Sequence, residues 1–202
     1  MKAIHTLYAR AMLLAFAGVY LLGCASEPEI PEVSYYLLRS DAPLSSGEQS
    51  SPATLGIGRV VAAEYLNQAG IVVITEDNKV RPARQHLWAE PLEWSIRTFL
   101  RDEIASRVDY PISGDPSRRL YWRHRIDIDI DRLDGTLDGQ VTLVASWILL
   151  DATSQVELAS YRFERNASTS RDGYDALVAT QSALLSDLAK AIADSLKTLP
   201  ST

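Results

Sequence analysis

The residue with the clearest potential for chemistry is Cys24, the only cysteine among the 202 residues. It directly follows Gly23 and the unbroken apolar run 11–22, and the residues before that run carry Lys2 and Arg10 but no acid. A thiol at this position is a nucleophile that could accept a diacylglycerol group. The run is too short for a transmembrane helix, which needs about 20 apolar residues. A charged start followed by a short apolar run is typical of an export signal.

Residues 21–24 (LLGC) resemble the lipobox of bacterial lipoproteins, in which a small residue precedes the modified cysteine. We therefore expect a lipoprotein signal peptide over residues 1–23 and lipidation of Cys24, which would supply the several acyl chains that stable anchoring needs. The alternative is an ordinary signal peptide with a chance cysteine. Ala25 and Ser26 follow, where an Asp usually retains a lipoprotein at the inner membrane. This favours the periplasmic leaflet of the outer membrane.

A second candidate for chemistry is the acidic row Asp127, Asp129 and Asp131, which resembles the start of a calcium-binding loop. An EF-hand needs Gly at the sixth position and Glu at the twelfth, where this chain has Arg132 and Asp138. The isoleucines between the aspartates indicate a strand with a solvated acidic face instead. We expect no metal site here.

The histidines are the remaining candidates for catalysis. Only His86 and His124 remain once the signal is removed, and they are far apart in the sequence. The chain contains neither a G-x-S-x-G nucleophile elbow nor a phosphate-binding glycine loop. His124 lies on the apolar side of its predicted strand, where a packed histidine is the simpler interpretation. We expect no catalytic site and no cofactor, and an anchored hydrolase is the weakest of the functional hypotheses.

Charge and composition narrow the function classes. Twenty Lys and Arg stand against 26 Asp and Glu, for a net charge of -6 and a pI near 5.1. A nucleic-acid binder would normally show a basic surplus, so nucleic acid is not an expected partner. With 47% apolar and 23% charged residues, the composition is that of an ordinary globular domain.

The elements that must position any site follow from periodicity. Residues 24–32 carry prolines and glutamates, which predicts a lipidated tether. Residues 33–202 are predicted to form one domain. Two amphipathic helices are predicted at about 89–108 and 173–199. Strands are predicted at 33–38, 55–62, 71–75, 78–81, 122–131, 141–150 and 156–165, with the last three forming an antiparallel meander. Six or seven strands and two long helices predict a layered α/β or α+β domain.

Three residues are candidates for a partner interface. Trp94 falls off the apolar stripe of the first helix, and an exposed Trp is a frequent anchor at protein interfaces. The alternative is that Trp94 packs under the loop at 40–53 or against a strand. Tyr65 and Leu66 lie between two predicted strands, where they form either a turn cap or a binding tip.

Several motifs taken together resemble the PqiC-type ABC-transport auxiliary lipoproteins over about residues 34–197. The W-A-E-P-L segment at 88–92 is the most specific of them. The others are the lipobox Cys24, the strand at 34–38, Glu64-Tyr65-Leu66, the D-x-D strand, Ala145-Ser146-Trp147 and Gly173-Tyr174. The chain departs from the family pattern around Tyr65-Leu66, where members often carry Pro before the pair and Asp-Arg after it. Here Glu64 precedes the pair and Asn67-Gln68 follow it, so partner specificity at this loop could differ.

The resemblance implies a single three-layer α/β domain with a mixed central sheet. It also implies a docking or structural subunit of an intermembrane lipid transporter that supports membrane integrity. The implied partner is an MCE-type tunnel protein of an inner-membrane complex, and related lipoprotein folds imply a homo-oligomer, with a ring as one arrangement. The alternative hypothesis is a periplasmic lipid-binding chaperone with its own apolar cavity.

Overall fold

A computed structural model gives the fold and describes residues 31–42, 54–75, 78–109, 111–136 and 138–197. The predicted signal peptide, Cys24 and most of the tether lie outside these residues. A compact unit begins at Val33. Its strands are β1 (Ser34–Tyr36), β2 (Leu55–Ala62), β3 (Gly70–Thr75), β4 (Lys79–Trp88), β5 (Ile112–Ser113), β6 (His124–Thr136), β7 (Gln140–Asp151) and β8 (Glu157–Ser168). Its helices are α2 (Leu92–Ala105) and α3 (Tyr174–Leu196), with 3-10 turns η1 (Glu64–Leu66) and η3 (Pro116–Tyr121).

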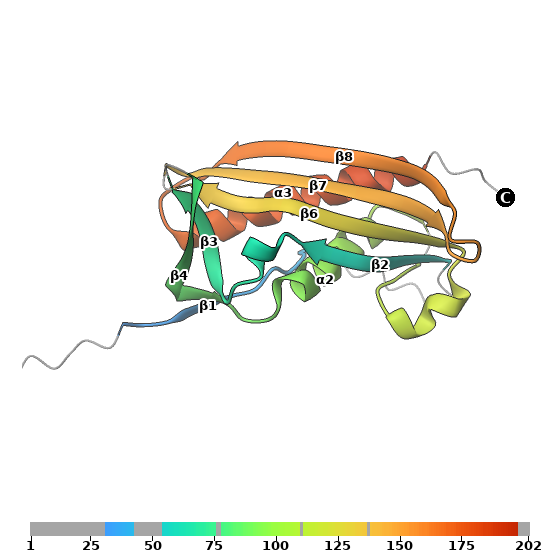
Figure 1. The fold of residues 1–202 in the computed structure, drawn as a ribbon, viewed down its shortest axis with the longest axis horizontal. Coiled ribbons are helices and arrows are strands. Elements are labelled where there is room, and N and C mark those ends of the chain that lie inside the picture. Colours follow the sequence, from blue (N-terminus) through green and yellow to red (C-terminus); the bar gives the residue numbers. More distant parts are fainter. Residues whose placement is uncertain (1–30, 43–53, 76–77, 110, 137, 198–202) are drawn as a thin grey trace, which may run out of the picture. The chain divides into compact units, whose positions relative to one another are not determined.

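Strand β6 organises the sheet, because it pairs with three other strands. Along one edge it is antiparallel to β7, which in turn pairs with β8. Along the other edge it is parallel to β2 from His124 to Ile130, and then parallel to β3 at Gly135 and Thr136. The sheet therefore forks, with β2 and β5 at one end of β6 and β3, β4 and β1 at the other (Figure 1). Turn η1 joins the two branches.

Both α-helices of the described residues lie on the same face of the sheet (Figure 1). Alternation places Ile126, Ile128 and Ile130 of β6 on this face, and all three are buried in the core. Trp147 of β7 also faces the helices, because its indole nitrogen donates to Ser195 Oγ of α3 at 3.2 Å.

The predicted α/β class and mixed sheet are confirmed, but the described residues form two layers where three were expected. The physical reason is the charge on the other sheet face, which carries exposed ion pairs such as Arg59–Asp129 at 3.1 Å. Covering such charges with an apolar layer would cost their solvation. The sheet also has eight strands in the described residues rather than six or seven. The additional strand is β5, whose two residues are too short to leave a periodic signal.

Helix α2 is shorter than predicted, because Pro91 has ψ 129° and stands just before the first helical residue. Its predicted apolar stripe is confirmed, with Leu92, Ile96, Phe99, Leu100 and Ile104 buried. Helix α3 begins after Gly173, whose φ of 104° favours glycine. The predicted antiparallel meander is confirmed as β6, β7 and β8. Strand β4 continues to Trp88, beyond the short return strand predicted at 78–81.

Candidate docking site

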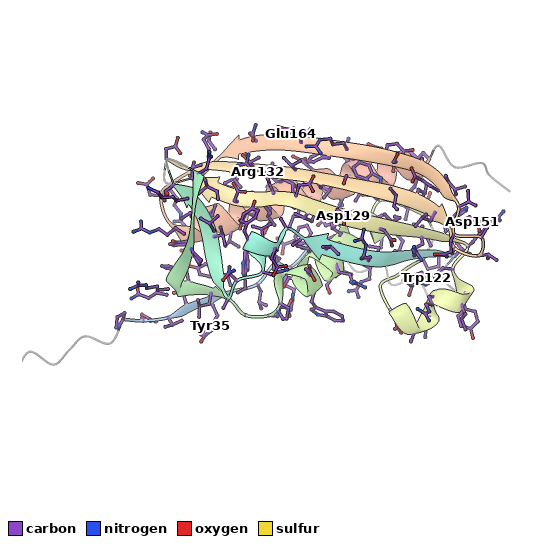
Figure 2. All side chains as sticks on the ribbon, viewed as in Figure 1. Tyr35, Trp122, Asp129, Arg132, Asp151 and Glu164 are labelled. Carbon is purple, nitrogen blue, oxygen red and sulfur yellow. The ribbon has the colours of Figure 1, made fainter. Side chains whose placement is uncertain are left out.

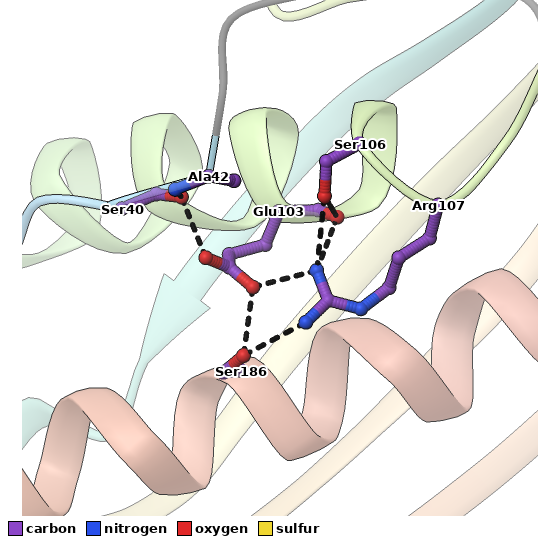
Figure 3. Close-up of polar contacts among 6 residues, drawn as sticks. All are labelled: Ser40, Ala42, Glu103, Ser106, Arg107 and Ser186. Atoms are coloured by element: carbon purple, nitrogen blue, oxygen red, sulfur yellow. Dashed lines mark hydrogen bonds and ion pairs between the residues drawn. The ribbon is translucent and has the colours of Figure 1, made fainter.

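A polar cluster fixes the N-terminal segment to both helices (Figure 3). Glu103 of α2 accepts hydrogen bonds from Ser40 at 2.6 Å and from Ser186 of α3 at 2.7 Å, and it pairs with Arg107 at 2.6 Å. Burial raises the pKa of Glu103, but the hydrogen bonds from Ser40, Ser186 and Arg107 outweigh burial and hold it below its usual value. This ionised carboxylate therefore joins three separate segments of the chain.

At the opposite end of α2, where the helix begins, lies an open pocket of about 430 Å³, which we call the docking pocket. It is formed by two segments that are far apart in the sequence. One is the loop after η1, and the other is the junction between β4 and α2. The lining residues are Asn67, Gln68, Ala69, Trp88, Glu90, Pro91, Leu92 and Glu93. The pocket therefore brings together the W-A-E-P-L segment and the loop where the sequence departs from the family pattern.

Backbone contacts fix the two walls of the docking pocket. Trp88 N donates to Ala69 O at 2.8 Å, which holds the loop against the end of β4. Gly70 allows this approach, because a Cβ there would overlap the backbone of Ala83 on β4. Leu66 holds the other end of the loop, with its side chain buried in the core. The pocket is therefore preformed by the fold.

The two carboxylates of the pocket are already engaged. Glu90 pairs with Arg39 and accepts a hydrogen bond from Ser95 at 2.6 Å. The hydrogen bond from Arg39 lowers the pKa of Glu90 despite the opposing effect of burial. Glu93 accepts from Ala62 N at 2.9 Å. What remains available is apolar surface with the exposed amide side chains of Asn67 and Gln68 beside it.

The three residues expected at a partner interface differ in how exposed their side chains are. Trp94, in the first turn of α2, is 56% exposed, so it does not pack into the core. Tyr65 is half-buried, and its hydroxyl donates to Asp134 Oδ2 at 2.5 Å. Leu66 is only 1% exposed, so its side chain is part of the core and does not form a binding tip. The η1 turn buries Leu66 because it crosses between the two branches of the sheet.

The acidic row and the two histidines, which were the candidates for metal binding and catalysis, have partners or packing within the fold. Asp127 is buried and accepts hydrogen bonds from Arg59 N and Arg125, each at 2.9 Å. In the part of the chain that the structure describes, no three acids, histidines or cysteines gather as a metal site would need. His86 stacks on Tyr174 with ring centroids 4.1 Å apart. Burial, followed by the charge of Arg123, lowers the pKa of His124.

A second pocket of about 120 Å³ lies at the start of α3, where Val73, Gly139 and Leu177 are among its lining residues. Pockets for drug-sized ligands hold about 300–1,000 Å³, and a phospholipid with two acyl chains is larger than such ligands. Neither pocket therefore favours the alternative of a lipid-binding chaperone. None of the helices in the described residues is long and apolar enough to cross a bilayer.

The fold is a two-layer α/β domain with an open pocket at the start of α2. The profile of the family described as "ABC-type transport auxiliary lipoprotein component" matches residues 36–193. This chain belongs to that family, as the resemblance in its motifs indicated.

Known relatives are similar to this chain in sequence, and solved structures share its fold. The intermembrane transport lipoprotein PqiC of Escherichia coli K12 is 28% identical over 193 residues, which cover 93% of this chain and 98% of PqiC. PqiC of Shigella flexneri gives the same values. A Xanthomonas campestris protein shares the fold with a TM-score of 0.64 and 16% identity, over 80% of this chain and 93% of its own. An uncharacterized protein of known structure gives a TM-score of 0.66 and 20% identity, over 82% and 99% of the two chains.

Two features of the site were not predicted from the sequence. Glu103 lies on the buried side of α2 between apolar residues, and its spacing from Phe99 and Leu100 was the available signal. The docking pocket had a weaker signal, because its two walls are 20 residues apart and only the β3–β4 hairpin brings them together.

Proposed function

We propose that this chain is an outer-membrane-anchored lipoprotein subunit of an MCE/ABC-type intermembrane lipid transport system. Its role would be to dock an MCE-type tunnel protein and so support membrane integrity. Membership of the family and the similarity to PqiC, an intermembrane transport lipoprotein, support a role in intermembrane transport. The observation that carries the docking role is the pocket formed by the W-A-E-P-L segment and the loop after Leu66.

The docking role is tested by photocrosslinking in the native envelope. A photoreactive residue at Gln68, exposed at the pocket, should crosslink the full-length protein to an MCE-type protein. The matched control places the same residue at Ala179, which is exposed on α3. Equal crosslinking from both positions, or no MCE-type protein captured from Gln68, would contradict the docking role.

The anchoring role is assigned to Cys24. Labelled palmitate should enter the full-length protein, and the label should disappear in Cys24→Ser. Separation of the two membranes by density should place the wild-type protein with the outer membrane. If Cys24→Ser still partitions with the envelope as the wild type does, the anchor is not this thiol.

We also propose that the domain forms a homo-oligomer. The support is the outer edge of β8, a strand of 12 residues that pairs only with β7 among the described residues. An open edge of this length is a template for pairing with another chain. Light scattering of the delipidated chain should give a mass above that of the monomer, and a monomer at all concentrations would contradict self-association.

A further inference from the structure

Exposed apolar side chains gather along one margin of the domain. Nine large apolar side chains are exposed in the described residues, and six of them belong to three regions: residues 33–37, the first turn of α2, and η3. These regions lie along the lower margin of Figure 1, whereas β8 forms the opposite margin. We call this the anchor-side margin; its six apolar residues are Val33, Tyr35, Leu37, Trp94, Leu120 and Tyr121.

The regions of the margin are held firmly by the fold. Ala89 N donates to Tyr36 O at 2.9 Å, and Ser40 donates to Glu103 at 2.6 Å, so β1 and the following segment are fixed to the residues just before α2 and to its last turn. Turn η3 is capped by Asp115, which accepts from Ser117 N at 2.9 Å. The exposed side chains therefore sit on ordered backbone.

The composition of the margin is that of a membrane interface. Tyr35 and Tyr121 are each 67% exposed and Leu120 is 88% exposed, and Figure 2 shows Tyr35 at this margin. Trp and Tyr are enriched at the level of lipid headgroups, where one end of the side chain is apolar and the other polar. Arg118 and Arg119 are both exposed on η3, and guanidinium groups bind lipid phosphates well.

The short stretch of chain between Cys24 and Val33 indicates which surface covers the margin. Nine residue steps separate Cys24 from Val33, so even a fully extended tether of about 3.3–3.6 Å per residue keeps the two within about 30 Å. Val33, where the domain begins, itself belongs to the margin, so the chain enters the domain beside the exposed aromatic side chains. Tethering converts the contact with lipid into an intramolecular event, so even weak individual contacts are occupied.

We propose that the anchor-side margin rests on the same bilayer that holds Cys24, with Tyr35, Trp94 and Tyr121 at headgroup level. This inference rests on the anchor assigned to Cys24 in the proposed function, and it adds a fixed orientation. Contact along the margin turns the open edge of β8 away from the lipid.

Trp94 supplies the probe that tests this contact. Of the four Trp residues, Trp88, Trp122 and Trp147 are buried, so Trp94 is the one that lipid could reach. The chain 24–202 is coupled through Cys24, its only thiol, to a maleimide lipid in phosphatidylcholine vesicles. Brominated acyl chains then quench indoles that lie in the interface. Wild-type emission should fall on bromination, and Trp94→Phe should lose the quenchable part.

Two further variants test the rest of the margin. Leu120→Ser with Tyr121→Ser should reduce the quenching of Trp94, because the η3 end would no longer hold the margin on the lipid. The matched control, Val80→Ser with Leu158→Ser, removes two exposed apolar side chains away from the margin and should leave quenching unchanged. Phosphatidylglycerol should increase quenching through Arg118 and Arg119.

The outcomes separate this inference from the proposed function. Vesicle flotation confirms that the protein is coupled, so emission that bromination does not change would overturn the membrane contact. A concentration-dependent blue shift of Trp94 emission without quenching by lipid would show that a second copy covers the margin, and would also overturn it. Because the coupling is chemical, these results do not depend on lipidation of Cys24 in the cell, which palmitate labelling tests separately.

Discussion

Replacing Glu103 with Gln should destabilise the domain at neutral pH and change its response to acid. The wild-type carboxylate accepts hydrogen bonds from Ser40 and Ser186 and pairs with Arg107 (Figure 3). Gln keeps the size of the side chain and loses its charge, so Arg107 would keep its positive charge without its carboxylate partner. The segment that carries Ser40 would also be held less firmly against α2.

The expected loss in free energy of unfolding follows from these contacts. Hydrogen bonds to charged groups contribute about 1.5–3 kcal/mol each when well shielded, and Gln retains part of each bond. The side chain of Arg107 is 30% exposed, so water screens its ion pair. We therefore expect Glu103→Gln to lower the free energy of unfolding by about 1–2 kcal/mol. For a domain of this size that corresponds to a decrease in Tm of about 2–8 °C.

The contribution of Glu103 to the free energy of unfolding should change with pH in one direction. Because the pKa of Glu103 in the folded protein lies below its usual value, its contribution is present above a pH of about 4.3. It is lost as the pH falls through the folded-state pKa. The difference in unfolding free energy between wild type and Glu103→Gln should therefore be largest at neutral pH and should shrink in acid.

Urea unfolding at a series of pH values measures both the loss of stability and its dependence on pH. Glu164→Gln is the matched control, because Glu164 is exposed on β8 and has no ion pair to a described residue. A variant as stable as the wild type at neutral pH would refute the reasoning. So would a penalty that stays constant in acid, because it would then come from packing rather than from charge.

Three other changes give clear expectations. Gly56→Ala should destabilise the domain by about 1–3 kcal/mol in urea, because a Cβ there would overlap the buried indole ring of Trp122; unchanged stability would show that the ring has room to move. Tyr65→Phe should cost about 1–2 kcal/mol, since buried Asp134 would lose a hydrogen bond, and an equal midpoint in urea would argue against that bond. The imidazole of His124 should titrate by NMR below its ordinary pKa, because burial disfavours its charged form. The free energy of unfolding should then rise with pH between the lowered pKa of His124 and about 6.5. His124→Gln should remove this rise.

Much of the fold was predictable because its periodic signals are long. The alternating isoleucines of β6 and the stripe of Leu92, Ile96, Phe99 and Ile104 on α2 each extend over several turns or residue pairs. Such patterns identify both the element and its buried face. The family resemblance rested on the same segments and on the W-A-E-P-L start of α2.

Elements that depend on tertiary pairing were not predictable. Strand β5 has two residues, and it exists because Ile112 and Ser113 pair with β2. The number of layers also depends on tertiary structure, since amphipathic helices of this kind could cover either face. Asp127 was expected on a solvated acidic face and is instead buried, because backbone and arginine donors satisfy it. Local sequence does not encode these partners.

The site was predictable only in part for the same reason. The sequence did not show whether Trp94 is exposed, and the fold gives its exposure, although most of the loop at 40–53 lies outside the described residues. Leu66 lies beside Tyr65 in the sequence, yet η1 directs one side chain into the core and leaves the other half-exposed. A single turn was too short to show which residue faces inward.

The forked pairing of β6 also determines when the chain can fold. Strands β2 and β3 are made early, but their shared partner begins at His124, about 50 residues later than the end of β3. Until that partner has been synthesised, the N-terminal half has no continuous sheet on which to bury its apolar residues. We therefore expect the nascent chain to lack a continuous sheet until β6 has been synthesised, so most of its core can form only late in synthesis.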